Sequence, residues 1–428
     1  MAGFLDSPAY RVHNGPHLLR GLPPSQMFLI KLGLAAFQKE HPDTTVYDAS
    51  QGDGGASLPG LSPTELTEAL MRFLPTQHAT RYGSPQGDAR VRQALFERYY
   101  RLSMSLGLTP DHIVLTDGGR DALQKLYQAI ALLGQRRGGA LLCSGAPWIS
   151  YGQGCYVNGL NLLCAPFQPL DFRVTPEGID EAMALAKSQG VPVEMLVLTS
   201  PDNPTGSFYT QEKLLRATQR AIEHGIKWIL WDFMYQLVLE DNAEPYDLGY
   251  LLSNLHPRER KCVVVLDGLT KSVGASNVRS AHLVCGSREL AQAITAVASH
   301  TVLPNVLGEA CAYELYQSGR PRQHRWVRRV VDSTNQSRRI FRTALQGKRI
   351  PFIADQGYYA FLDLSEHARA ADLSATALCE RFTRQHGLAM VPGDAFQQPG
   401  WARFSLAQAP EYTRAAVQRL MEGLATLR

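Results

Sequence analysis

Short apolar runs alternate with amphipathic segments along much of this chain, and the alternation predicts strands and helices in turn. Runs such as 113–116, 195–200 and 262–266 are brief and have no polar alternation, which is typical of strands buried on both faces. Glycines, prolines and helix-period segments separate these runs. From about residue 110 to 285, this order predicts a mostly parallel sheet covered by helices on both faces.

Other parts of the chain predict further helices and one short strand. Residues 27–40, 62–73 and 89–102 have apolar residues at helical spacing, and the second of these segments begins with a sequence typical of a capping box. Residues 45–50 predict a strand that ends at a glycine cluster. Residues 1–25 are rich in Gly, Pro and His, and we expect them to form an arm that packs on another surface.

Three polar side chains, Asn203, Asp232 and Lys271, follow three separate buried strands. Open α/β sheets bind their ligands at the carboxyl ends of such strands. A lysine placed there can be partly desolvated, which lowers the pKa of its amine and makes it nucleophilic. Any one of these residues alone would more often be an ordinary loop residue. The three together indicate a site.

A strand at 113–116 runs into Gly118, Gly119 and Arg120, and a helix follows. This order aims free backbone N–H groups and a helix dipole at an anion. The motif alone is weak, because many such turns bind nothing. Arg279, eight positions after Lys271, adds a second cation. The set is suited to a phosphate group.

Pyridoxal phosphate is a cofactor that needs all of these groups. Its aldehyde requires a lysine, its ring nitrogen an acidic partner, and its phosphate a helix N-terminus and an arginine. We therefore expect pyridoxal 5′-phosphate to be the cofactor.

Composition narrows the class of protein further. A chain of 428 residues favours two domains over one. A net charge of +4 is too small to indicate nucleic acid or a membrane surface as a partner. No His/Cys cluster has metal-ligand spacing, the seven cysteines form no CxxC pair, and the first residues have no signal-peptide pattern. We expect a cytoplasmic protein without a metal.

At this point the sequence resembles the fold-type I aminotransferases of the aspartate aminotransferase superfamily, class I/II. The resemblance extends from Pro24 to Ser405, with the family's motifs in order. It implies a large domain with a mostly parallel, seven-stranded-type sheet sandwiched by helices, and a smaller α+β domain. The expected division is an arm and part of the small domain at 1–55, the large domain at 56–305 and the C-terminal small domain at 306–428.

The resemblance also implies a role for each matching residue. Lys271 is the Schiff-base lysine, Asp232 the partner of the pyridine nitrogen, and Tyr235 and Asn203 the donors to the ring oxygen. Trp148 stacks on the ring. The phosphate contacts are Gly118, Gly119, Arg120, Arg279 and, from a neighbouring subunit, Tyr82. For the substrate, Gly52 lies near the carboxylate, Arg403 grips it, and Asn203 belongs to the same site.

Two positions depart from the usual family pattern. The family commonly has a small hydroxyl residue three positions before the lysine, where this chain has Gly268, while Thr270 keeps a hydroxyl directly before Lys271. After Arg279 the usual glycine is absent, and Ser280 follows instead. One phosphate contact is expected to be lost, or supplied by Arg120 or Thr270.

The leading function is transfer of the amino group of an L-amino acid to a 2-oxo acid. The alternative is another reaction of the same fold on an amino acid, such as elimination or replacement, cyclisation or oxidation, which the Gly268 departure favours modestly. An amino-acid-binding regulator would need a DNA-binding module that the arm is too short to supply. A phosphate-binding protein without pyridoxal would leave Asp232, Tyr235 and Lys271 unexplained.

The sequence indicates less about the identity of the substrate and about the assembly of chains. Gln51, Asp53, Trp148 and the arm are candidates for contacting the donor's side chain, with a weak preference for a polar or basic one. The match at Tyr82 implies a homodimer in which each active site is built from two chains.

Overall fold

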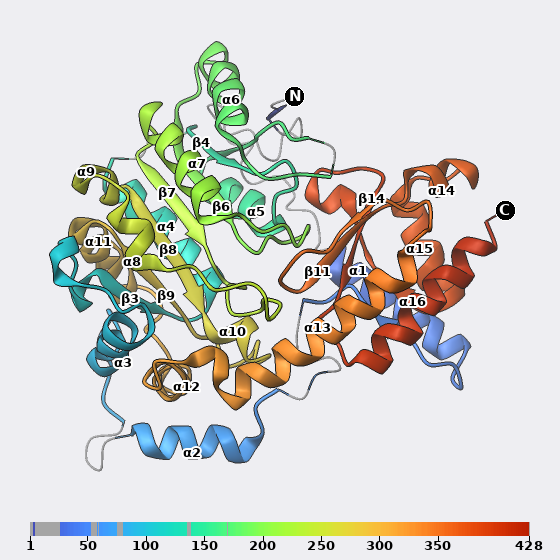
Figure 1. The fold of residues 1–428 in the computed structure, drawn as a ribbon, viewed down its shortest axis with the longest axis horizontal. Helices are drawn as coiled ribbons and strands as arrows, with labels where there is room; N and C mark the ends of the chain where they lie inside the picture. Colours follow the sequence, from blue (N-terminus) through green and yellow to red (C-terminus); the bar gives the residue numbers. More distant parts are fainter. Residues whose placement is uncertain are drawn as a thin grey trace.

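The computed structural model describes residues 3–4, 26–52, 58, 60–74, 80–134, 138–168 and 170–427. It is an α/β structure in which an eight-stranded sheet forms the larger body and a four-stranded sheet belongs to the smaller one (Figure 1). The large sheet has the strand order β1-β5-β4-β6-β7-β8-β9-β3. Its strands are β1 Gly3–Phe4, β3 Ile113–Thr116, β4 Ala140–Cys143, β5 Asn161–Cys164, β6 Val193–Thr199, β7 Trp228–Asp232, β8 Val263–Gly268 and β9 Ala281–Cys285.

The five central strands of this sheet, β5, β4, β6, β7 and β8, run parallel to one another. The strand β9 is antiparallel to both of its neighbours, β8 and β3, and β1 is antiparallel to β5. The sheet is therefore mostly parallel, as the sequence predicts. Because parallel strands end at the same edge, the segments after β6, β7 and β8 meet there.

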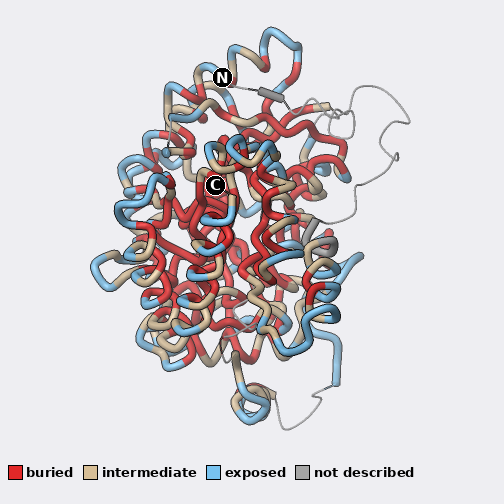
Figure 2. Tube along the Cα trace, turned by 90° about the vertical axis from the view of Figure 1, so that its right-hand side faces the viewer, coloured by how far each residue is buried: buried red, intermediate tan, exposed pale blue. Residues whose placement is uncertain are grey.

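Helices cover both faces of the large sheet, because alternate strand residues point to opposite sides. Side chains of α4 (Gly119–Leu132), α5 (Ile149–Val157) and α11 (Arg288–Ser299) share one hydrophobic cluster with strand residues such as Leu230 and Val264. The other face packs against α6 Pro176–Ser188, α7 Gln211–Glu223, α8 Leu248–Ser253 and α12 Val306–Tyr316. Burial is continuous through these layers (Figure 2).

The smaller body is built on the sheet β10-β11-β14-β13, whose pairings are antiparallel. Its strands are β10 Phe352–Ile353, β11 Tyr359–Asp363, β13 Val391–Pro392 and β14 Trp401–Ser405, and a separate pair joins β2 Tyr47–Asp48 to β12 Leu388–Ala389. The helices of this body are α1 Gln26–Glu40, α14 Ser365–Ala370, α15 Ala375–His386 and α16 Pro410–Ala425. The helix α13 (Arg325–Leu345) runs between the two bodies (Figure 1).

The predicted domain boundary at residue 305 stays a prediction. Side chains at 310–331, from α12 and the first part of α13, belong to the core of the large sheet. The core of the smaller body contains Ala49 and residues from Phe341 onward. The change from one core to the other thus falls inside α13.

The predicted helices and strands are largely confirmed. The helix α2 (Pro63–Phe73) begins at the Ser62 capping box, in which Ser62 and Glu65 bond each other's backbone N–H groups. The segment expected as one helix over 89–102 is instead α3 (Ala89–Gln93) followed by a π-helical turn (Ala94–Tyr99). The remaining short helices are α9 Pro257–Arg260 and α10 Leu269–Ser272, with 3₁₀ turns at Met104–Leu106, Pro110–His112, Pro321–Gln323 and Gly393–Phe396.

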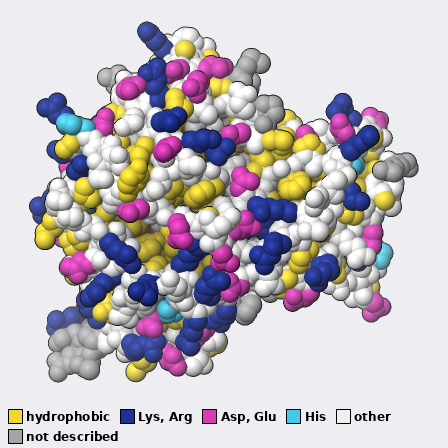
Figure 3. Space-filling view, in the orientation of Figure 1, with side chains coloured by type: hydrophobic (Ala, Val, Ile, Leu, Met, Phe, Trp, Pro, Cys, Tyr) yellow, Lys and Arg dark blue, Asp and Glu magenta, His cyan; other side chains and the backbone are white. Residues whose placement is uncertain are grey.

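The surface in Figure 3 mixes Lys and Arg with Asp and Glu, as the small net charge leads one to expect. Within the described ranges, no helix combines the length and the apolar character that a membrane span requires.

Candidate active site

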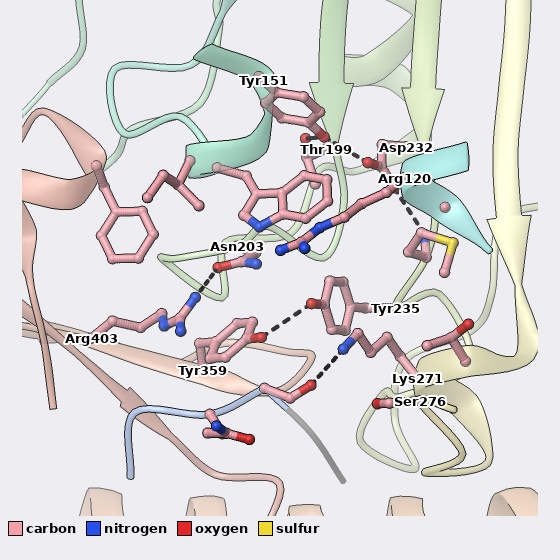
Figure 4. Close-up of a pocket in the computed structure, with 18 of the residues that line it drawn as sticks. Arg120, Tyr151, Thr199, Asn203, Asp232, Tyr235, Lys271, Ser276, Tyr359 and Arg403 are labelled. Carbon is pink, nitrogen blue, oxygen red and sulfur yellow. Dashed lines mark hydrogen bonds between the residues drawn. The ribbon is translucent and has the colours of Figure 1, made fainter. Parts of the chain in front are cut away.

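A cavity of about 630 Å³ lies at the carboxyl edge of the large sheet, facing β14 of the smaller one. It brings together most of the residues predicted from the sequence, drawn from segments far apart in the chain (Figure 4). The predicted residues that line it are Gly52, Gly119, Arg120, Trp148, Asn203, Asp232, Tyr235, Thr270, Lys271, Arg279 and Arg403.

Lys271 lies in the single helical turn α10, directly after β8. Its Nζ donates a hydrogen bond of 2.5 Å to the backbone carbonyl of Gly52, a residue that follows the two-residue strand β2. The hydroxyl of Tyr358 donates to the backbone carbonyl of Lys271 itself. The amine is thus held in the cavity, and the turn that carries it is fixed from the smaller body.

Asp232 ends β7 and is 3% exposed. Its carboxylate accepts a hydrogen bond of 2.6 Å from the hydroxyl of Tyr151, which also lies 2.8 Å from Thr199 Oγ1. Burial raises the pKa of Asp232 to about 6, and the bond from Tyr151 acts in the opposite direction. A buried carboxylate of this kind is suited to pair with a cationic ring nitrogen, because such a partner offsets its desolvation.

The glycine turn before α4 has the geometry of an anion site. Gly118 is the N-cap residue with φ of 90°, and a Cβ at this position would overlap the guanidinium of Arg279. Arg279 itself has φ of 54°, and its backbone carbonyl accepts a hydrogen bond of 2.7 Å from Asn305 Nδ2. The helix N-terminus and the guanidinium therefore meet at one end of the cavity.

Ser276 also lines this cavity, and its hydroxyl oxygen is buried. No group within the described ranges hydrogen-bonds to it. Buried hydroxyls are usually satisfied, so an unpartnered one indicates a ligand that supplies the missing contact.

Close packing explains why residue 268 is a glycine. A Cβ there would lie 2.6 Å from the Ser280 carbonyl oxygen and 2.8 Å from Ala281 Cα, so the neighbouring strand leaves no room for a side chain. Thr270 Oγ1 donates to the same Ser280 carbonyl at 3.3 Å. The departure at Gly268 is thus accompanied by a close approach of the β9 backbone.

Arg403, on β14, is 5% exposed and forms the other end of the cavity. Its Nη1 donates to Asn203 Oδ1 at 2.8 Å, and its Nη2 donates to the Ser50 carbonyl at 2.6 Å. Its Nε is buried with no hydrogen-bond partner among the described residues. A guanidinium left with an unused donor is prepared to bind a carboxylate.

Arg120 and Trp148 occupy the wall between these two ends. The Arg120 guanidinium carbon lies 5.8 Å from the centre of the Trp148 ring, and Trp148 packs edge-on against Tyr151. Trp148 directly precedes α5 and lines the cavity. A flat ring here can cover one face of a planar cofactor.

Tyr235 and Tyr359 also line the cavity. The two hydroxyl oxygens lie 3.2 Å apart, although the residues are 124 positions apart in the chain. Burial raises the pKa of Tyr235 well above its ordinary value, so its hydroxyl stays protonated and able to donate.

Some predicted residues lie elsewhere. Tyr82 is 96% exposed and is absent from the lining, and Gly118 contacts the site through Arg279. Gln51 lines the cavity. Asp53 and most of the arm at 1–25 lie outside the described residues.

Sequence reasoning missed Tyr151, Ser276 and Tyr359. Tyr151 follows Trp148 by three positions, and side chains at this spacing are neighbours at the start of a helix. The spacing could therefore have indicated Tyr151. Nothing in the local sequence distinguishes Ser276 or Tyr359 from other loop and strand residues.

The site fits pyridoxal phosphate on its own geometry. The Gly118 turn with Arg279 and the Ser276 hydroxyl suit a phosphate, Asp232 suits a ring nitrogen, and Trp148 suits the ring face. Within the described ranges, no group of three or more His, Cys, Asp or Glu side chains is arranged to hold a metal ion.

Comparison with known proteins points to the same chemistry. Residues 52–420 match the model of the family described as aminotransferase class I and II. The aspartate/prephenate aminotransferase of Thermus thermophilus is 26% identical over 84% of this chain and 86% of its own length. The human 1-aminocyclopropane-1-carboxylate synthase-like protein 1 is 25% identical over 89% of this chain and 78% of its own. The solved structure of the Thermus thermophilus aspartate aminotransferase with maleate superposes with a TM-score of 0.79 at 22% identity, covering 96% of this chain and all of that one.

Proposed function

The chain belongs to the class I and II aminotransferases, which are pyridoxal-phosphate-dependent enzymes, and from that premise we propose that Lys271 is the lysine that carries the cofactor. The observation that supports this most directly is the meeting of Lys271, Asp232 and the Gly118–Arg279 cradle in one cavity. Each comes from a different strand end of the same sheet.

We propose that the cofactor is held by residues at four places. Gly119, Arg279 and Ser276 would bind the phosphate, Asp232 the ring nitrogen, and Asn203 and Tyr235 the ring oxygen, with Trp148 against the ring face. When bound, pyridoxal phosphate supplies an aldehyde that links covalently to amines and a ring that withdraws electrons from the substrate carbon.

The roles of the protein side chains follow from their chemistry. Arg403 binds the α-carboxylate of the amino acid through Nε and its remaining N–H groups. Lys271 Nζ would hold the aldehyde of the cofactor and, as a free amine, would take the proton from the substrate Cα and return it. Asp232 would pair with the protonated ring nitrogen, and Tyr151 keeps Asp232 in place.

The test is a panel of L-amino acids added to the holoenzyme. A donor should abolish the visible absorbance of the bound cofactor and yield the corresponding 2-oxo acid, which mass spectrometry identifies. Addition of a second 2-oxo acid should restore the absorbance. The Lys271→Ala protein should show neither change.

We propose an acidic amino acid as the donor. Two observations support it: a relative named for aspartate and prephenate, and the Arg120 guanidinium, which lines the cavity and forms no ion pair with any described residue. A distal carboxylate would pair with Arg120 while Arg403 holds the α-carboxylate. The Arg120→Leu change separates this from the phosphate role: it should weaken L-aspartate binding roughly tenfold without weakening cofactor binding. Weaker cofactor binding with unchanged aspartate binding would assign Arg120 to the phosphate.

The alternatives are elimination or replacement, cyclisation and oxidation. Of these, only cyclisation is supported by the name of a relative, the 1-aminocyclopropane-1-carboxylate synthase-like protein 1. The Gly268 departure no longer supports them, because packing against Ser280 accounts for it. Replacement and cyclisation would give products other than a 2-oxo acid in the same mass spectra, whereas elimination and oxidation would release ammonia, which transamination does not.

We propose further that the enzyme is a C2 homodimer in which Tyr82 serves the partner's site. The exposure of Tyr82 supports this, since it leaves the hydroxyl available to a second chain. Mixing Tyr82→Phe chains with Lys271→Ala chains should give activity above that of either parent, because one site of each mixed dimer carries neither change. Full activity of a monomer in sedimentation would exclude the dimer.

We also propose a cytoplasmic location. The seven cysteines, which are all free, support it because thiols stay reduced in the cytosol. Cell fractionation tests this.

A further inference from the structure

Tyr359 contacts both Arg403 and Tyr235 in the active-site cavity. It is the first residue of β11, is 2% exposed and lines the cavity. The centre of its ring lies 4.4 Å from the guanidinium carbon of Arg403. Its hydroxyl lies 3.2 Å from the hydroxyl of Tyr235. One side chain therefore contacts Arg403 on β14 and Tyr235 in the loop after β7 (Figure 4).

The orientation of the Arg403 guanidinium depends in part on the ring of Tyr359. Its two Nη atoms are held by hydrogen bonds to Asn203 and Ser50. The guanidinium carbon lies over two aromatic rings, 4.4 Å from the centre of Tyr359 and 5.0 Å from the centre of Phe396. A cation over an aromatic face is attracted by the ring's quadrupole, more strongly where water is excluded. The ring of Tyr359 thus helps to set the plane in which Arg403 presents Nε.

Tyr359 is itself held from several sides. A Cβ on Gly52 would overlap its hydroxyl, so the hydroxyl has room only because residue 52 is a glycine. On the backbone side, a Cβ on Gly206 would lie 2.5 Å from the Tyr359 carbonyl oxygen. These close approaches leave the side chain little freedom to move away.

The chain just before Tyr359 is also anchored. The buried guanidinium of Arg338 donates to the Gly357 carbonyl, and the Gly357 N–H donates to the Val238 carbonyl at 2.9 Å. The next residue, Tyr358, donates to the backbone carbonyl of Lys271. The start of β11 is therefore tied to the large body at the lysine turn and at the loop after Tyr235.

We propose that Tyr359 is a positioning residue that fixes Arg403 relative to Tyr235, an assignment that rests on the function proposed above. Its ring orients the arginine that receives the substrate carboxylate. Its hydroxyl orients the tyrosine that donates to the cofactor ring. Since the substrate must contact Arg403 and the cofactor ring at once, a constant relation between Arg403 and Tyr235 would keep the substrate aligned with the cofactor.

The ring and the hydroxyl can be tested separately, because phenylalanine keeps one and removes the other. For the ring, Tyr359→Leu should raise the KM for the amino donor roughly tenfold, whereas Tyr359→Phe should change it less than about threefold. In an Arg403→Ala background, Tyr359→Leu should add almost nothing to KM. Equal effects of Tyr359→Leu in both backgrounds, or equal effects of the leucine and phenylalanine changes, would overturn the role of the ring.

For the hydroxyl, the measured quantity is the dissociation constant of pyridoxal phosphate, which needs no substrate. Tyr359→Phe should raise it roughly fivefold, the effect typical of losing one neutral hydrogen bond. In a Tyr235→Phe background, the same change should have no further effect. An unchanged dissociation constant in the Tyr359→Phe single variant, or an undiminished effect in the double variant, would overturn the role of the hydroxyl.

The control for a general loss of buried hydroxyl groups is Tyr209→Phe. Tyr209 is also buried and bonds the Val174 backbone through its hydroxyl, but it is not part of the cavity lining. This variant should lower the free energy of unfolding in urea while leaving both KM and the cofactor dissociation constant unchanged. Failure of the wild-type protein to carry cofactor on Lys271 would refute the proposed function, whereas the variants above address only Tyr359.

Discussion

The hydroxyl of Tyr151 donates a hydrogen bond of 2.6 Å to the carboxylate of Asp232, and both groups are buried beneath the active-site cavity. Burial raises the pKa of Asp232 to about 6 in the folded protein, and this bond opposes the rise. Tyr151 therefore keeps Asp232 ionised at a pH where burial alone would favour its protonated form.

The Tyr151→Phe change should make the cofactor-free protein more sensitive to pH. A carboxyl with a raised folded pKa stabilises the fold at low pH, and this contribution is lost as the pH rises from about 4 to about 6. Without Tyr151 the folded pKa rises further, so the loss becomes larger and extends to higher pH. Urea unfolding at several pH values should show the stability difference from wild type growing between pH 5 and pH 8, values chosen to bracket the folded pKa near 6. A difference that is constant with pH would contradict the account.

Arg403→Ala should separate substrate binding from cofactor binding. Loss of a charge-assisted pair should weaken amino-acid binding by roughly 1.5–3 kcal/mol, while the visible absorbance of the bound cofactor stays intact. Absorbance titration with the amino donor measures the first effect. The exposed Arg339→Ala serves as the matched control. Loss of cofactor with unchanged amino-acid affinity would mean that Arg403 has been assigned to the wrong ligand.

Ser276→Ala should weaken the binding of pyridoxal phosphate, because the phosphate would lose a hydrogen bond from the buried Ser276 hydroxyl. The expected increase in the dissociation constant is roughly tenfold, as for a hydrogen bond to a charged group. Pyridoxal without the phosphate should bind both proteins equally. Ser188→Ala, at an exposed helix end, is the control. A matching loss of affinity for pyridoxal would show that Ser276 acts on the fold and not on the phosphate.

Gly268→Ser would restore the hydroxyl residue common in the family, yet we expect it to destabilise this protein. The added Cβ would lie 2.6 Å from the Ser280 carbonyl oxygen, and overpacking of this kind costs roughly 1–3 kcal/mol. Urea unfolding of the cofactor-free protein measures the loss. A stable variant with tighter cofactor binding would show that the glycine reflects an absent phosphate contact and not close packing.

The strand ends were readable from the sequence because they depend on local pattern. Asn203, Asp232 and Lys271 each follow an apolar run, and parallel strands bring such ends together whatever lies between them. The Gly118 turn was readable for the same reason, since strand, glycine and helix are contiguous there.

Contacts between distant segments could not be predicted. Tyr359 meets Tyr235 only because β11 of the small sheet lies against the loop after β7, and no local pattern encodes that approach. The unpartnered hydroxyl of Ser276 becomes evident only when burial is known. Likewise, Gly268 appeared as a departure from the family pattern until the backbone of β9 was seen beside it.

Reduction of the holoenzyme with borohydride, followed by peptide mapping, identifies the lysine that carries the cofactor. The reagent makes the link between cofactor and lysine permanent, so mass spectrometry identifies the lysine that carries it. We expect a single modified peptide containing Lys271, and no modification of the buried Lys125, which is paired with Asp121. A cofactor label on Lys125, or on any lysine other than Lys271, would contradict the assignment of the active site.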